Sequence, residues 1–215
     1  MKYRLIVFDW DGTIIDSAST IAACMQDAAR DLGVAVPPLE RARHVIGLGL
    51  HDAMRIAVPE VPAQRYPEFV ASYRKHFLAR KDAMQLFDGM RSLLEELSGT
   101  HALAVATGKS RAGLDRDLDF HKLKPLFASS RCADETNPKP HPAMLIELMD
   151  ELGVDSQASL MIGDTSHDLE MARAASVDAL AVTYGAHPED GLRACQPLHC
   201  VPDVAALQRW LKQNG

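Results

Sequence analysis

Short apolar runs alternate along the chain with segments whose apolar residues recur at helical spacing. The apolar runs have the length of buried strands, and five are predicted as strands: residues 3–9, 101–107, 125–130, 159–164 and 178–184. The segments with helical spacing are residues 90–97, 111–118, 141–153, 167–176 and 204–211. Strands that are apolar throughout and joined by helices are typical of a parallel sheet with helices on both faces. We therefore predict an α/β fold in three layers.

The segment from Asp16 to Gln85 departs from this alternation, because its periodicity is helical throughout. It contains two apolar stripes at helical spacing, Ile21, Met25, Ala28, Ala29 and Leu32 in the first and Tyr66, Phe69, Val70, Tyr73 and Phe77 in the second. Both stripes are most simply interpreted as helix faces buried in a core. We predict one core domain formed by residues 1–15 and 86–215, into which residues 16–85 are inserted as an all-helical cap domain.

The composition limits the classes of partner. The chain has 215 residues, 47% of them hydrophobic, enough for one sizeable core with an inserted subdomain. A net charge of −6 and a pI near 5.8 argue against binding to nucleic acid or to anionic membrane. The N-terminus lacks a signal-peptide pattern, the four cysteines form no CxxC pair, and no apolar run is long enough to span a bilayer. We expect a cytoplasmic protein, monomeric or homodimeric.

Polar residues follow several of the predicted strands directly. Asp9 and Asp11 end the first strand, Thr107-Gly108 ends the second, and Asp164 ends the fourth, with Asp168 four residues later. Because ligands of parallel sheets bind beyond the carboxyl ends of the strands, these side chains should converge on one edge. Lys139, in the segment NPKPHP, should be held near the same edge by the neighbouring prolines.

Several carboxylates in one place repel one another unless a cation is bound, and a site with only oxygen ligands suits Mg²⁺. Asp9 is our candidate nucleophile towards phosphorus, and Asp11 the general acid and base. Thr107 and Lys139 would face the phosphate. We also expect Trp10, Gly12 and Gly108 to contact the substrate, since Gly12 lets the chain turn and leaves backbone N–H groups free to point at phosphate oxygens.

These motifs, D-x-D-G-T at residues 9–13, T-G at 107–108, K-P at 139–140 and G-D-x-x-x-D at 163–168, resemble in order and placement those of the haloacid dehalogenase-like superfamily. With a helical cap after the first motif, the chain is most similar to the phosphoglycolate phosphatase-like branch. The resemblance implies a Rossmann-like core and magnesium bound by Asp9, Asp164 and the backbone carbonyl of Asp11. It places the Asp168 carboxylate either near the metal or against Lys139.

The resemblance implies a magnesium-dependent phosphatase that acts on a small organic phosphomonoester through an aspartyl-phosphate, with phosphoglycolate as the first candidate substrate. In the cap, Arg43 and His44 flank the segment IGLGL and are predicted to contact the substrate. Lys109, which follows Thr107, could add positive charge near the phosphate.

Two other functions remain open from the sequence. A sugar-phosphate mutase of the same superfamily has much the same core. A receiver-like switch would accept a phosphoryl group without turnover, although it would need neither the second acid, Asp11, nor the helical insertion.

Overall fold

Within residues 2–215, which the computed structural model describes, the centre of the molecule is a six-stranded parallel sheet in the order β3-β2-β1-β4-β5-β6. The strands are β1 (Leu5–Phe8), β2 (Ala102–Thr107), β3 (Ser129–Cys132), β4 (Ser159–Gly163), β5 (Asp178–Val182) and β6 (His199–Val201). Phe8 of β1 is paired in register with Val105 of β2 and Ile162 of β4, so the carboxyl ends of these strands reach the same edge.

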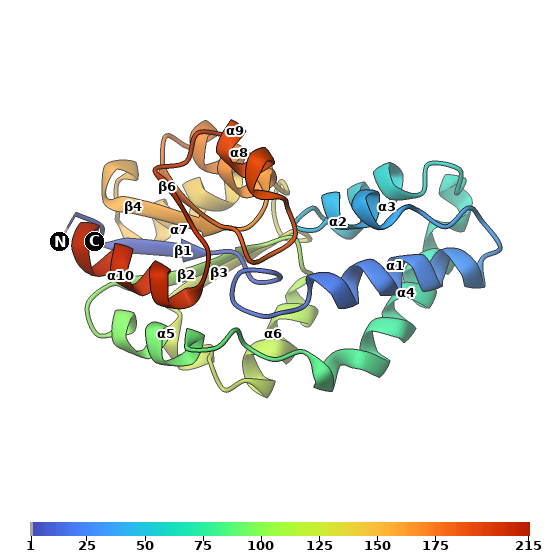
Figure 1. The fold of residues 1–215 in the computed structure, drawn as a ribbon, viewed down its shortest axis with the longest axis horizontal. Coiled ribbons are helices and arrows are strands. Elements are labelled where there is room, and N and C mark those ends of the chain that lie inside the picture. Colours follow the sequence, from blue (N-terminus) through green and yellow to red (C-terminus); the bar gives the residue numbers. More distant parts are fainter. Residues whose placement is uncertain (1) are drawn as a thin grey trace.

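Helices cover both faces of the sheet, as Figure 1 shows. One face packs against α5 (Met90–Ser98), α6 (Arg111–Phe120) and α10 (Val204–Asn214). The other packs against α7 (Ala143–Leu152) and α8 (Ser166–Ala174), and α9 (Glu189–Ala194) lies beside α8. Alternate residues of β1 supply the two cores, Ile6 and Phe8 to one side and Leu5 and Val7 to the other. The predicted three-layer α/β fold is confirmed.

The helical insertion lies at one end of the core (Figure 1). It consists of α1 (Ala18–Asp31), α2 (Leu39–His44), α3 (Leu50–Ala57) and α4 (Tyr66–Arg80), with 3₁₀ turns at Ala63–Arg65 and Lys81–Ala83. These helices enclose their own apolar cluster, in which Met54 and Phe69 are fully buried. An all-helical insertion after the first strand is therefore confirmed.

The chain leaves and re-enters the core through two segments that run side by side. The amide of Asp16 donates to the Gln85 carbonyl at 2.9 Å, and the amide of Phe87 donates to the Ile14 carbonyl at 3.1 Å. The predicted domain limits at residues 16 and 85 fall within these paired segments, and the division into two domains stays a prediction.

Two strand predictions need correction. The third strand is Ser129–Cys132 rather than residues 125–130, because Lys124–Leu126 forms a 3₁₀ turn and the apolar run precedes the strand. The sixth strand, His199–Val201, was not predicted; it has three residues and lies at the sheet edge, where no long apolar run is needed.

The features that bear on compartment are few. All four cysteines are free thiols. Among the helices of residues 2–215, none combines the length and the apolar character required to cross a bilayer.

Candidate active site

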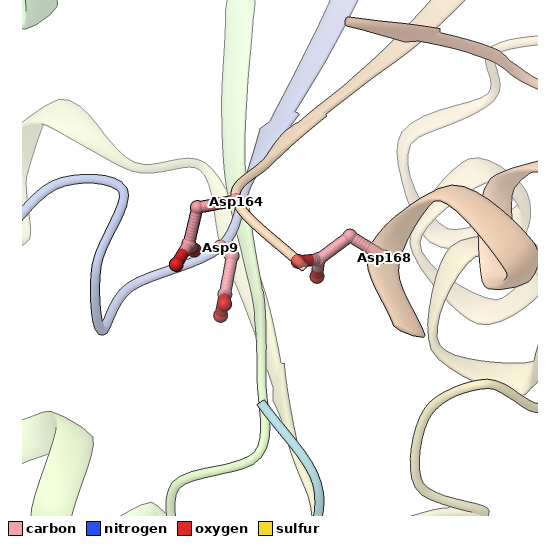
Figure 2. A group of neighbouring side chains, drawn as sticks. All are labelled: Asp9, Asp164 and Asp168. Atoms are coloured by element: carbon pink, nitrogen blue, oxygen red, sulfur yellow. The ribbon is translucent and has the colours of Figure 1, made fainter. Parts of the chain in front are cut away.

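Three aspartates meet where β1 and β4 end. Asp9 directly follows β1, Asp164 directly follows β4, and Asp168 lies in the first turn of α8. All three are fully buried, and each offers a carboxylate oxygen within 4.8 Å of the others. In Figure 2 the Asp168 carboxylate is directed from its helix towards the other two. These three side chains therefore converge at one edge of the sheet, as predicted.

Lys139 is the cation of this cluster. Its ammonium lies 2.8 Å from Asp9 Oδ1 and 2.5 Å from Asp168 Oδ1, with the side chain fully buried. Burial alone would lower the pKa of Lys139, but the carboxylates of Asp168 and Asp9 raise it overall, so the lysine stays charged.

Asp9 has one oxygen that is held and one that is free. Its Oδ1 accepts from the Trp10 amide at 2.6 Å as well as from Lys139. Its Oδ2 is buried and has no hydrogen-bond partner within the described chain. Burial raises the pKa of Asp9 well above the usual aspartate range; Lys139 opposes this shift, and the charges of Asp168 and Asp164 add to it. A buried polar atom without a partner indicates a ligand at this position.

Asp164 is fixed by donors from two other segments. Its Oδ1 accepts from the Thr13 hydroxyl at 2.8 Å and its Oδ2 from the Ala186 amide at 2.7 Å. Burial raises the pKa of Asp164 to about 7, with a further contribution from Asp168. The carboxylate is packed so closely that a Cβ on either Gly12 or Gly185 would lie 2.2 Å from Oδ2, so both positions require glycine.

These residues fit a divalent cation. Three carboxylates and the single ammonium of Lys139 leave two negative charges uncompensated in a buried space. All the donor atoms are oxygens, which is the ligand type that Mg²⁺ prefers. The raised pKa values of Asp9 and Asp164 have the same origin, since burial and mutual repulsion disfavour their charged forms when no ion is present.

Asp168 differs from Asp9 in that protein donors contact both of its oxygens, and from Asp164 in that one of these donors is the Lys139 ammonium. Oδ1 pairs with Lys139, and Oδ2 accepts from the Thr165 amide at 3.0 Å and the Thr165 hydroxyl at 2.7 Å. Thr165 and Asp168 form a reciprocal cap at the start of α8. Of the two roles that the sequence left open for Asp168, this geometry matches the one that holds Lys139.

Asp11 belongs to a second ionic cluster beside the first. Its carboxylate contacts the Lys109 ammonium at 2.9 and 3.0 Å and accepts from the Ser17 hydroxyl at 2.8 Å. Lys109 also pairs with Asp117 of α6 at 3.2 Å. The Lys109 side chain is only 9% exposed and its ammonium lies 4.7 Å from the centroid of the Phe77 ring on α4. Lys109 thus holds Asp11 rather than presenting a free charge.

Asp9, Asp11, Thr107 and Gly108 line one cavity of about 560 Å³ between the core and the cap. Residues 45–53 of the cap form part of its wall. Gly108 lies against the loop between α2 and α3, because a Cβ there would be 2.4 Å from the Gly47 carbonyl oxygen. The IGLGL segment therefore covers the site where Thr107 and the acids meet.

Two residues of the first motif are placed differently from the prediction. The side chain of Trp10 is fully buried in the core, edge-on to Phe127 at 6.4 Å between ring centroids, and does not line the cavity. Gly12 does not line the cavity, and its own amide donates within the turn to the Ile15 carbonyl at 2.9 Å. Trp10 points away because it continues the alternation of β1: Ile6, Phe8 and Trp10 all belong to the same core cluster.

Arg43 and His44 do not line the cavity either. The Arg43 guanidinium donates to the carbonyls of Gly185, at 2.9 Å, and Ala186, at 3.3 Å. The His44 carbonyl accepts from the rings of His167, at 2.9 Å, and His187, at 3.0 Å. Both residues instead join the cap to the loop after β5 and to the start of α8.

Three residues of the site were not identified from the sequence. Thr13 and Ser17 lie within the stretch FDWDGTIIDS and bond to Asp164 and Asp11, so their hydroxyls next to the acid pair were a usable signal. Asp117 was treated as part of an amphipathic helix, and nothing in its local pattern indicates the contact with Lys109.

Comparisons with known proteins agree with this geometry. A family model described as haloacid dehalogenase-like hydrolase matches residues 6–182. The probable phosphatase IndB of Dickeya dadantii is 36% identical over 90% of this chain and 86% of its own length. A 5'-nucleotidase of Pseudomonas aeruginosa is 34% identical over all of this chain and 98% of its own length. A phosphoglycolate phosphatase of Aliivibrio fischeri is 30% identical over 90% of each chain.

Proposed function

Since the chain belongs to the haloacid dehalogenase-like hydrolase family, we propose that it is a magnesium-dependent phosphatase that hydrolyses small organic phosphomonoesters through an aspartyl-phosphate on Asp9. The observation that carries the proposal is the unpartnered Oδ2 of Asp9, buried beside Lys139 where the cavity meets the sheet. A carboxylate oxygen that is held in place but has no partner is suited to attack an electrophile.

The first half of the reaction transfers the phosphoryl group to the protein. Oδ2 of Asp9 forms a bond to phosphorus while the bond from phosphorus to the ester oxygen breaks. Asp11 donates a proton to the departing oxygen, so that an alcohol leaves rather than an alkoxide. Lys139, fixed by Asp168, keeps the Asp9 carboxylate in one orientation during this transfer.

The second half returns the protein to its starting state. A water molecule attacks phosphorus, Asp11 accepts its proton, and the bond between Asp9 and phosphorus breaks to release inorganic phosphate. Thr107 and Gly108 line the cavity next to Asp9 and would contact the phosphate oxygens. The cap loop that covers Gly108 limits the access of bulk water.

Asp9, Asp164 and the backbone carbonyl of Asp11 would hold the magnesium ion, with Asp168 assigned to Lys139. When bound, the ion would offset the charge of the carboxylates and of the phosphate. Phosphoglycolate, predicted from the sequence, is the substrate named for one relative, and a nucleotide is named for another. The identity of the alcohol is therefore a separate question from the reaction.

The test is release of inorganic phosphate from p-nitrophenyl phosphate with and without Mg²⁺. We expect sustained turnover that chelation of Mg²⁺ abolishes, and a loss of roughly 10⁴-fold or more in Asp9→Asn. Asp150→Asn is the matched control, because it makes the same change at an exposed position on α7. A single phosphorylation per chain without further turnover would instead identify a receiver-like switch, and transfer of phosphate between two sugar hydroxyls a mutase.

A further inference from the structure

The cavity above Asp9 is much larger than a phosphate group requires. Its volume of about 560 Å³ lies within the range of pockets that enclose small organic molecules. The cap side of the wall is mainly apolar, with Ile21, Met25, Val45, Leu48, Tyr73 and Phe77 as its principal side chains. The organic part of a substrate, which extends from the phosphate towards the cap, therefore contacts apolar side chains.

The two buried lysines that contact the cavity-lining acids Asp9 and Asp11 are already neutralised. Lys139 pairs with Asp9 and Asp168, and Lys109 pairs with Asp11 and Asp117, so each ammonium has two carboxylate partners. A second anionic group on the substrate would have to compete with these carboxylates. Neither lysine can serve as its counter-ion without leaving a buried aspartate unpaired.

The cap offers little compensation for such an anionic group. Besides Lys109, the described cavity-lining residues able to carry positive charge are His51 and Arg74 of the cap, both exposed to solvent, and Arg116 of α6. The Arg116 side chain is 38% exposed and lies 3.8 Å from Asp117. A carboxylate placed against the apolar wall would lose its hydration without gaining a partner. An apolar group in the same place would gain free energy by leaving water.

Resting on the proposed function, we propose that the preferred substrates are phosphomonoesters whose organic group is uncharged, mostly apolar and larger than the two-carbon acid of phosphoglycolate. The phosphate would lie at Asp9 and Thr107, and the organic group would contact the apolar wall formed by α1, α4 and residues 45–53.

The inference is tested with three esters of primary alcohols: ethyl phosphate, phenethyl phosphate and phosphoglycolate. Ethyl and phenethyl phosphate share the same reacting bond, so a difference in kcat/KM reports contacts with the cap. We expect phenethyl phosphate to exceed ethyl phosphate by roughly tenfold or more. Phosphoglycolate is expected to be no better a substrate than ethyl phosphate.

A charge placed on the wall should shift this preference. Leu78 lines the cavity from α4 and is 45% exposed, so Leu78→Lys can be made without burying an ammonium. We expect it to raise the kcat/KM of phosphoglycolate relative to phenethyl phosphate by roughly tenfold. Ile146→Lys on α7, 42% exposed and outside the cavity, is the control and should leave this ratio unchanged.

The outcomes separate this inference from the proposed function. If p-nitrophenyl phosphate is hydrolysed but phosphoglycolate is preferred to phenethyl phosphate, or phenethyl phosphate is no better than ethyl phosphate, the inference is overturned and the phosphatase assignment stands. If no ester is hydrolysed with Mg²⁺ present, the proposed function itself is refuted.

Discussion

Lys109 is the residue whose replacement most directly tests the role of Asp11. The Lys109 ammonium contacts both oxygens of Asp11 and one of Asp117, and its side chain is almost fully buried. Burial works to lower the pKa of Lys109, but the two carboxylates raise it overall. Lys109→Met keeps most of the side-chain volume and removes only the charge, so Asp11 loses its ionic partner while Ser17 still donates to it.

The size of the effect on stability follows from the contacts. Removing one partner of a buried ion pair costs roughly 3–5 kcal/mol. The lower end applies here, because Asp11 lines an open cavity where water can reach it and Arg116 lies 3.8 Å from Asp117. At roughly 2–4 °C per kcal/mol for a chain of this size, we expect Lys109→Met to lower Tm by roughly 6–12 °C.

The effect on activity should depend on the leaving group. An alkoxide needs a proton in order to leave, whereas p-nitrophenolate leaves readily without one. If Lys109 holds Asp11 in position for that transfer, the kcat/KM of Lys109→Met should fall by roughly 10²-fold for ethyl phosphate and by only a few-fold for p-nitrophenyl phosphate. Because kcat/KM covers only the steps up to formation of the phosphoenzyme, the later role of Asp11 as a base does not enter the comparison.

The assay measures both esters at matched Mg²⁺ concentration, with Lys124→Met as a control that removes an exposed lysine. In an Asp11→Asn background, Lys109→Met should cost little further activity, since the residue it positions is already absent. Equal losses for the two esters would refute the reasoning, because they would mean that Lys109 supports the site in general rather than the proton transfer.

Three other predictions follow from the site. Saturating Mg²⁺, at about 100 times Kd, should raise Tm by roughly 5–10 °C. Asp164→Asn should remove most of this shift. Burial raises the pKa of Asp164 to about 7, so a proton must leave before the ion binds. The rise in Tm caused by Mg²⁺ should therefore be larger at about pH 8 than at about pH 6, and the absence of such a difference would contradict this. Gly108→Ala should raise KM roughly tenfold and lower the free energy of unfolding by about 1–3 kcal/mol, because its Cβ would collide with the cap loop. The control is Gly99→Ala, because the nearest atom to a Cβ at that position is 3.6 Å away. Arg43→Ala should lower Tm by roughly 4–8 °C through loss of its two carbonyl contacts, and it should leave the ranking of esters unchanged. The control is Arg41→Ala, which removes an exposed arginine. A changed ranking in Arg43→Ala would mean that Arg43 contacts the substrate after all.

The fold was predictable because the signals that define it are local. The apolar runs of β1, β2, β4 and β5 are each bounded by polar residues, and the alternation with helices then dictates a parallel sheet. The edge strands carry weaker signals. The sequence of β3, SSRC, includes two serines and an arginine, whereas the more apolar residues 125–127 lie just before the strand. The apolar pattern therefore predicts a strand that begins four residues too early.

The candidate site was predictable to the extent that it depends on strand ends. Asp9, Thr107 and Asp164 come at or directly after the ends of strands that are adjacent in the sheet, so topology alone brings them together. Contacts that depend on the orientation of a helix or of the cap carry no such signal. The pairing of Lys109 with Asp117 depends on the orientation of α6, and that of Arg43 with the Gly185 carbonyl depends on how the cap meets the core.

The placement of Trp10 illustrates a constraint that the sequence did contain. In an extended segment, residues two apart face the same side and their neighbour faces the other. Once Asp9 and Asp11 are assigned to one cavity, the side chain between them must point away from it, and an indole there fits the apolar core that packs on that face. The same alternation explains why the two acids are separated by one residue: adjacent side chains would face opposite sides, whereas Asp9 and Asp11 line the same cavity.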